Sequence, residues 1–182
     1  MAYHRAMDTT AAPVALAESD QDPTEAAHQK APWLTAEEQR LWRAHLEVSR
    51  LLMYQLEREL QPHGLSNNDY TILVELSEAP QHRMRMTDLA VATLQSKSRL
   101  SHQITRMEAA GLVTRDSCPG DRRGLYAVLT DAGWQTMRRI APQHVRSVRE
   151  HFIDRFDEDQ VAAMYEALAP VAEHLRELRG RG

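Results

Sequence analysis

The side chains best suited to contact nucleic acid fall on one face of a predicted helix that runs from Ser96 to Ala110. The apolar residues Leu100, Ile104 and Met107 share one side of this helix at the helical spacing of 100° per residue. The remaining surface carries short hydroxyl, imidazole and cationic groups: Ser96, Lys97, Ser98, Arg99, Ser101, His102, Thr105 and Arg106. Such side chains reach base edges and phosphates in a DNA groove. A merely solvated helix face more often carries Glu–Lys pairs, so the pattern favours groove reading.

A second group of candidate contacts occupies the segment Pro119–Gly124. A hairpin tip needs Gly, Pro and Asp for its backbone angles, but it does not need two adjacent arginines, Arg122 and Arg123. One of these arginines can enter a minor groove, because narrow A·T tracts concentrate negative potential there. Asp121 can hold the neighbouring guanidinium group in a fixed direction. A loop tip that is only soluble is the alternative interpretation of the same residues.

Charge is distributed unevenly along the chain. The 182 residues carry a net charge of −4, but residues 83–123 hold eight basic and four acidic side chains, a local balance of +4. The rest of the chain therefore carries −8. A basic surface on an acidic body concentrates contact with phosphate in one region. Chance clustering on a solvated face is the alternative.

The elements around these residues follow one another in an informative order. Thr87 is expected to cap a two-turn helix, and the helix from Ser96 ends at Gly111, a residue that tolerates a left-handed C-cap. Alternation and β-propensity predict three short strands: residues 83–86, 112–115 and 125–129. A helix, a tight turn, a second helix and a β-ribbon in this order predict a winged helix-turn-helix, which is a DNA-reading unit.

Two helices are predicted before this unit. Thr35 and Glu38 form a capping box for a helix that continues to Leu60. Its apolar surface is too broad for a single contact, so we expect this helix to lie between two layers. Ser66 and Asp69 begin a shorter helix with an Asp variant of the same box, and this helix ends at Ala79–Pro80.

Two further helices are predicted after the ribbon. Thr130 caps a helix that reaches the region of Phe156, and Asp157 begins the last helix. Pro142 and Pro170 are expected to bend them. Apolar residues recur in the last helix at three- and four-residue steps: Val161, Met164, Tyr165, Leu168, Val171, Leu175 and Leu178. A stripe on a terminal helix needs a partner, so we expect it to pair with the first helix and with a second subunit.

The expected organisation is one folded domain between two tails. We expect an N-terminal tail over 1–32, a single domain over 33–178 and a C-terminal tail over 179–182. Within the domain, residues 33–61 and 131–178 are expected to form a helical dimerisation region, and residues 66–130 a DNA-binding lobe. The first tail is polar and aperiodic, which predicts disorder. No signal peptide or membrane span is apparent, and a single cysteine allows no intrachain disulfide. A cytoplasmic protein is therefore expected.

These residues together resemble the MarR family of bacterial transcription regulators. The most specific matches are Leu89–Ala90, the helix Ser96–Glu108 running into Glu-Ala-Ala-Gly-Leu-Val, and Asp121–Gly124 followed by Leu129–Gly133. The resemblance covers all but the N-terminal tail, and its motifs are specific only in combination. It implies a mainly helical fold with a small antiparallel β-wing, of about six helices and two to three strands.

The resemblance also implies how such a protein works. It implies a homodimer that binds a palindromic operator in double-stranded DNA, with one recognition helix in each major-groove half-site. In the family's wing an Asp-x-Arg pattern supports the arginine that enters the minor groove, and the matching residues here are Asp121 and Arg123. A transcriptional regulator, with repression as the expected sign, is the function that follows.

The resemblance further implies a small phenolic or lipophilic effector that releases DNA. Five residues come from the helices that would line its cleft: Trp42, His45, Ser49, Tyr54 and Tyr70. Core and interface packing is the favoured alternative for these five. Neither a cofactor nor a metal site is predicted, because Cys118 stands alone and no carboxylate or thiol set accompanies the histidines.

Two other classes of function are alternatives to DNA reading. An enzyme is not predicted, because the sequence has no glycine-rich phosphate loop and no Ser/His/Asp or Cys/His pattern. The remaining alternative is a winged-helix module that binds other proteins and does not read DNA. Full activity after substitution of Arg99 and Arg123 would favour that module.

Overall fold

The computed structural model describes residues 33–118 and 120–180, and of Arg122, Arg123 and Gly180 it describes the backbone alone. The predicted N-terminal tail at 1–32 lies outside these residues. The chain divides into two units, residues 1–40 and 41–182. Six α-helices and a three-stranded antiparallel sheet are seen in the described part of the chain. The predicted mainly helical fold with a small β-wing is therefore confirmed.

Helix α1 (Ala36–Leu60) begins with the predicted capping box. The Thr35 backbone N–H donates to Glu38 Oε2 at 2.7 Å, and the Glu38 N–H donates to Thr35 Oγ1 at 3.3 Å. The rest of the helix departs from expectation. Only Leu56 and Leu60 are buried, and Leu51, for example, is 61% exposed. The prediction that α1 lies between two layers is wrong for the single chain, because most of its apolar surface has no partner there.

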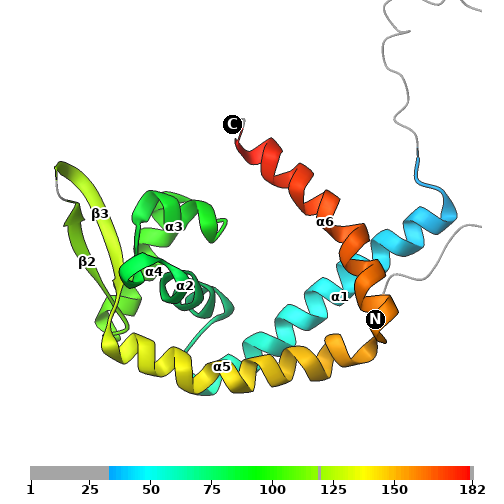
Figure 1. Cartoon of the computed structure of the whole chain (residues 1–182), viewed down its shortest axis with the longest axis horizontal. Helices are drawn as coiled ribbons and strands as arrows, with labels where there is room; N and C mark the ends of the chain where they lie inside the picture. The colour runs from blue at the N-terminus through cyan, green and yellow to red at the C-terminus, as the bar shows by residue number, and fades with distance from the viewer. Residues whose placement is uncertain (1–32, 119, 181–182) are drawn as a thin grey trace, which may run out of the picture. The chain divides into compact units, whose positions relative to one another are not determined.

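The core of the second unit lies where α2 (Asn67–Glu78), α3 (Met86–Ala92) and α4 (Lys97–Ala109) meet the sheet. Figure 1 shows these three helices grouped beside the β-ribbon, with α5 following directly from the end of β3. The side chains at the centre of this core are fully buried: Ile72, Leu73, Leu76, Leu89, Leu100 and Ile104. The apolar side of the predicted recognition helix therefore fixes its orientation by packing into this core.

The sheet has the order β1-β3-β2, with β1 (Arg83–Arg85), β2 (Val113–Cys118) and β3 (Asp121–Leu129). The expected third strand is confirmed. The two long strands extend beyond the predicted ranges, so most of the expected loop belongs to β3. Their outer pairs join polar residues such as Asp116 and Tyr126. Backbone pairing continues there without the apolar alternation that sequence reading relies on.

The helix that leads into the turn also differs from its prediction. Helix α3 begins at Met86, two residues before the start expected from a cap at Thr87, and the residue before it, Arg85, makes no side-chain cap. The Thr87 hydroxyl donates to the Asp88 carboxylate at 3.1 Å instead of accepting from the helix backbone. Between α3 and α4, Leu94 adopts a φ of 56° and is 76% exposed. The turn therefore holds a left-handed residue that is not glycine.

The junction between β3 and α5 (Asp131–His151) depends on a close backbone approach. Thr130 caps α5 by accepting from the Gly133 N–H at 3.0 Å, and its hydroxyl also donates to the Gly111 carbonyl at 2.7 Å. A Cβ on Gly133 would lie 2.0 Å from the Leu112 carbonyl oxygen. Only glycine fits at this position unless the backbone shifts.

The last two helices are confirmed with altered boundaries. Helix α5 ends at His151, short of the predicted Phe156, and a 3₁₀ turn (Ile153–Arg155) follows. The rings of Phe152 and Phe156 meet edge to face across this turn at 5.3 Å. Helix α6 (Glu158–Gly180) continues past the expected end of the domain at 178. Both internal prolines lie inside helices that are assigned without interruption.

One buried carboxylate joins α2 to α4. Asp69 Oδ2 accepts hydrogen bonds from the backbone N–H and hydroxyl of Ser66, which completes the predicted capping box. Asp69 Oδ1 accepts from the side-chain amide of Gln103 at 2.9 Å, and both residues are buried. Removing either partner leaves a buried polar group unsatisfied, which costs free energy.

A second polar cluster joins α1 to α5. Glu59 accepts hydrogen bonds from Ser147 and Gln55, and its Oε1 lies 3.0 Å from His151 Nε2. Burial alone would raise the pKa of Glu59, but the hydrogen bonds from these three neighbours outweigh burial and lower it. Two helical turns before His151 in α5, the ring of His144 lies 4.2 Å from the ring of Tyr70 in α2. Burial lowers the pKa of His144, although the charge of Glu59 opposes this shift.

Replacing Asp69 with Ala is expected to lower the free energy of unfolding by about 2–3 kcal/mol, because a helix cap is weakened and the Gln103 amide loses its buried acceptor. Urea unfolding at one protein concentration measures the change. The exposed neighbour Asn68 supplies a matched control, since Asn68→Ala is expected to cost less than about 0.5 kcal/mol. Equal losses in the two variants would contradict the proposed role of the buried carboxylate.

The lowered pKa of His144 predicts a pH dependence of stability with a definite sign. Between the unfolded value near 6.5 and the lower folded value, the unfolded chain binds more protons than the folded chain. Stability is therefore expected to fall as pH falls below about 6.5. His144→Phe keeps a ring against Tyr70 but binds no proton, so its stability should fall less over the same window. Urea midpoints measured from pH 7.5 to 5.5 test this, and identical pH profiles would contradict it.

Candidate nucleic-acid interface

Helix α4 separates its two predicted faces in the structure. Its start is fixed by Ser96, whose hydroxyl accepts from the Arg99 N–H at 3.2 Å. The three apolar residues of the predicted inner side are buried, and the predicted polar residues are all exposed: Ser96, Lys97, Ser98, Arg99, Ser101, His102, Thr105 and Arg106. The polar face can therefore approach a partner without rearrangement of the core.

The two cationic side chains at the start of α4 are exposed to solvent. Lys97 and Arg99 lie in the first turn, where the helix dipole adds positive potential. Among residues 33–118 and 120–180, no ion pair involves either of them. Negative phosphate groups would be attracted to this end of the helix.

Arg106 is held differently from Lys97 and Arg99. Its Nη2 lies 3.7 Å from Asp69 Oδ1, while 69% of its side chain remains exposed. The same carboxylate oxygen accepts the hydrogen bond from Gln103. Arg106 is thus guided by the contact between α2 and α4, and the rest of its guanidinium group is free to face solvent.

Arg115 of β2 binds the polar face of α4 from the side. Its guanidinium group pairs with Glu108 and donates to the Ser101 carbonyl at 2.7 Å and to the Thr105 hydroxyl at 3.0 Å. Only 20% of the Arg115 side chain is exposed. This arginine therefore joins the ribbon to α4, and it occupies part of the hydrogen-bonding capacity of Thr105.

The wing tip is organised by Asp121. Its Oδ1 accepts from the Gly124 N–H at 3.0 Å, and its Oδ2 pairs with Arg85 Nη1 of β1 at 3.2 Å. A Cβ on Gly124 would lie 2.5 Å from Asp121 Oδ2 and 2.9 Å from the Cys118 sulfur, so glycine permits the close contact. The side chains of the predicted contacts Arg122 and Arg123 lie outside the described residues.

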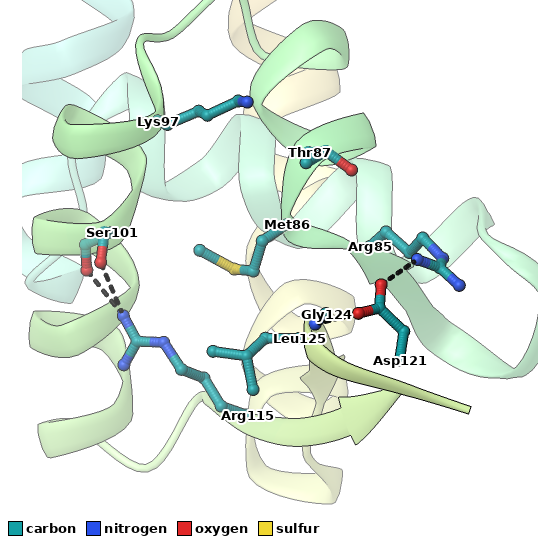
Figure 2. A pocket seen from close by; sticks show the side chains of 9 residues that line it. All are labelled: Arg85, Met86, Thr87, Lys97, Ser101, Arg115, Asp121, Gly124 and Leu125. Atoms are coloured by element: carbon teal, nitrogen blue, oxygen red, sulfur yellow. Dashed lines mark hydrogen bonds and ion pairs between the residues drawn. The ribbon is translucent and has the colours of Figure 1, made fainter. Parts of the chain in front are cut away.

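A hollow of about 310 Å³ separates the start of α4 from the wing. It is lined by Arg85, Met86, Thr87, Lys97, Ser101, Arg115, Asp121, Gly124 and Leu125. Figure 2 shows Arg115 directed toward Ser101 on one side and Arg85 toward Asp121 on the other. Two of its three cationic groups are thus fixed by partners within the protein, and both connect the wing to its surroundings.

The five candidate effector residues are not gathered at one place. Tyr70 is buried in the core against His144, which agrees with the packing interpretation. Its pKa is raised by burial. Trp42 and His45 stack on each other at 5.8 Å and are exposed, and so are Ser49 and Tyr54. The four α1 residues are therefore surface residues of the single chain.

Cys118 is buried beneath the wing tip and 4% exposed. In the described part of the chain, no group of three His, Cys, Asp or Glu side chains is placed to hold a metal ion. No helix of that part is both long enough and apolar enough to cross a membrane.

Three residues that organise the interface were not identified from the sequence. Gln103 and Arg85 each bind a carboxylate of a distant segment, and Arg115 binds α4. Gln103 lies on the same side of α4 as the apolar residues Leu100 and Ile104. That position was the one signal in the sequence that its side chain is buried. The two arginines carried no such signal, because charge counting treats every basic residue alike.

Comparison with known proteins gives a consistent result. A sequence model of the MarR family matches residues 63–124. AbsC, a MarR family transcriptional regulator from Streptomyces coelicolor, is 62% identical in a match that covers 81% of this chain and 99% of AbsC, with a TM-score of 0.77. Sco3205, a MarR family transcriptional regulator from the same organism whose crystal structure is in complex with DNA, is 44% identical over 81% of this chain and 93% of Sco3205, with a TM-score of 0.77.

A more distant similarity is found to the HTH-type transcriptional regulator PecS of Dickeya dadantii. It is 28% identical over 130 residues, which are 70% of this chain and 77% of PecS. The similarity to AbsC and to Sco3205 extends over 81% of this chain in both cases. The chain belongs to the MarR family of transcriptional regulators.

Proposed function

We propose that this regulator binds a palindromic operator in double-stranded DNA as a homodimer and represses the genes that the operator controls. The observation that carries this proposal is the exposed polar face of α4, which has Lys97 and Arg99 at its start. A helix of this kind fits the major groove, where its first turns reach base edges and phosphates. A dimer seated across a promoter would exclude polymerase, so repression is the expected sign.

The proposed contacts divide between two grooves. Base reading is assigned to the face of α4 that carries Ser98, Arg99 and His102, with Ser96, Lys97, Ser101 and Arg106 beside it. The minor-groove contact is assigned to the wing, with Arg123 as the inserted side chain, Arg122 beside it and Asp121 as its support. Sco3205, which shares 44% identity, has a crystal structure in complex with DNA, and this similarity supports the proposal.

The proposal of a homodimer rests on apolar surface that the single chain leaves exposed. In α6 the exposed apolar side chains are Val161, Tyr165, Leu168, Val171, Leu175 and Leu178, and in α1 they include Leu41, Trp42 and Leu51. Monomeric soluble proteins rarely leave such contiguous apolar surface in water. A second copy of the same helices supplies a complementary partner with two-fold symmetry.

An effector and a cellular location complete the proposal. A small phenolic or lipophilic ligand is proposed to bind near Trp42, His45, Ser49 and Tyr54, which are exposed on α1 and include one stacked aromatic pair. Tyr70 is buried, so it would affect this ligand site only through the packing of the core. The protein is proposed to act in the cytoplasm, where bacterial DNA lies.

The start of α4 provides the first test of DNA binding. Arg99→Ala is expected to weaken binding to a selected palindromic duplex by about 1–3 kcal/mol, because one contact to base or phosphate is lost. Gel-shift titration at fixed salt measures the change. Arg155→Ala removes the same charge from an exposed position outside the lobe and should leave the affinity within about twofold. Equal effects of the two substitutions would remove α4 from the mechanism.

The dimer makes a separate prediction. Leu168→Glu combined with Leu175→Glu places two charges in the proposed apolar interface, so the dimer is expected to dissociate at micromolar concentration. Sedimentation velocity measures the oligomeric state. Glu166→Ala combined with Glu173→Ala, on the same helix, should leave it unchanged. A double Glu variant that remains dimeric, or a wild-type chain that is monomeric and binds DNA at full affinity, would contradict the dimer.

A further inference from the structure

We propose that Arg85 is a positioning residue that holds the Asp121–Gly124 tip of the wing in the direction from which the tip contacts DNA. This inference rests on the proposed function, because it assigns a role within the same protein–DNA interface. Arg85 lies in β1, outside the ribbon that forms the wing. It reaches the tip through its side chain alone.

The sheet by itself does not support the wing tip from the side. Strand β1 pairs with β3 over three residues and ends where Arg85 lies opposite Tyr126. On the tip side of Tyr126, from Leu125 to Asp121, β3 is paired with β2 alone. The register of that pairing is irregular between Ser117 and Cys118. An isolated two-stranded ribbon is only marginally stable and can bend. The outer part of the wing therefore needs a further contact to keep one direction.

The ion pair between Arg85 and Asp121 supplies that contact. Arg85 Nη1 lies 3.2 Å from Asp121 Oδ2, while Asp121 Oδ1 accepts from the Gly124 N–H at 3.0 Å. One carboxylate thus joins the backbone of the tip to a strand outside the ribbon. The absence of a side chain at Gly124 allows this carboxylate to sit against the backbone. Figure 2 shows the guanidinium group of Arg85 directed at the carboxylate of Asp121.

The guanidinium group of Arg85 is itself held in place. Its central carbon lies 5.7 Å from the centre of the Tyr126 ring, and that of Arg83 lies 5.0 Å from the same ring. Cation–π contacts of this kind restrict the orientation of an arginine. Arg83 and Arg85 therefore share one aromatic support, but only the contact of Arg85 extends to the Asp121 carboxylate.

The exposure of this ion pair indicates that it orients the wing tip more than it stabilises the fold. The side chain of Arg85 is 42% exposed and that of Asp121 is 45% exposed. Ion pairs with this much solvent contact contribute little to folding stability. Loss of Arg85 should therefore leave the protein folded, and should release the tip that carries Arg122 and Arg123.

A double-mutant cycle on the full-length chain tests this role. The probe is a duplex enriched from random-sequence DNA by the wild-type protein, titrated in gel shifts at fixed salt. Arg85→Met should weaken binding by about tenfold, comparable to loss of one specific contact. In the background of Arg123→Ala, the same Arg85→Met substitution should change the affinity by less than about twofold. A positioning residue loses its effect once the contact that it positions is gone.

The neighbouring arginine provides the matched control. Arg83→Met removes the same charge from the same strand and the same aromatic ring, and is expected to weaken binding by less than about threefold. Hydroxyl-radical footprints should show that Arg85→Met loses protection in the flanking minor grooves while the central protection remains. Thermal melts should stay within a few degrees of the wild type. Should Arg85→Met unfold, Arg85→Gln replaces it with the same expectations.

Several outcomes would overturn the inference. Additive effects of Arg85→Met and Arg123→Ala, or equal effects at Arg83 and Arg85, would show that Arg85 acts only as a positive charge. If Arg123→Ala binds DNA with unchanged affinity, the wing does not contribute to binding and this inference is overturned. The proposed role of α4 would remain intact. Failure of the wild-type chain to enrich any duplex would instead overturn the proposed function itself.

Discussion

The buried hydrogen bond between Asp69 and Gln103 is the constraint on which the candidate interface depends. It connects the first turn of α2 to the middle of α4, and the same carboxylate guides Arg106. Because the bond is buried, it is directional and costly to leave unmade. The apolar side of α4 determines which face is inward, and this bond helps to fix how far the helix is rotated and shifted along its axis.

A second consequence of the structure is a division of labour among the basic residues. Arg115 joins β2 to α4 through Glu108, and Arg85 joins β1 to the wing tip through Asp121, so each forms an ion pair within the protein. Lys97 and Arg99 are exposed at the positive end of α4, where the proposed DNA contact would be made. These two arginines thus connect α4 and the wing tip, the two elements proposed to contact DNA, to neighbouring strands.

Local signals were sufficient to predict most of the fold. The capping boxes at Thr35 and Ser66, the glycine after α4 and the inward stripe of α4 were read correctly because each depends on neighbouring residues. The full length of the ribbon was missed because pairing between polar strand residues leaves no periodic trace. The start of α3 was missed because the Thr87 hydroxyl binds the Asp88 carboxylate and does not cap the helix. The partners of Arg85 and Arg115 were missed because contacts between distant segments follow from the fold alone. The exposure of the apolar residues of α1 was missed for the same reason, because it depends on which distant segments pack against that helix.

We propose that two copies of α4 read a symmetric DNA site while the wings contact its flanks. The most direct measurement is to select bound fragments from random or genomic DNA with the full-length protein and to footprint the preferred duplex at base resolution. We expect two inverted half-sites about one helical turn apart, roughly 10 bp between centres, with major-groove protection at each and minor-groove protection outside them. A preferred duplex with a single asymmetric site, or no enrichment of any sequence, would contradict it.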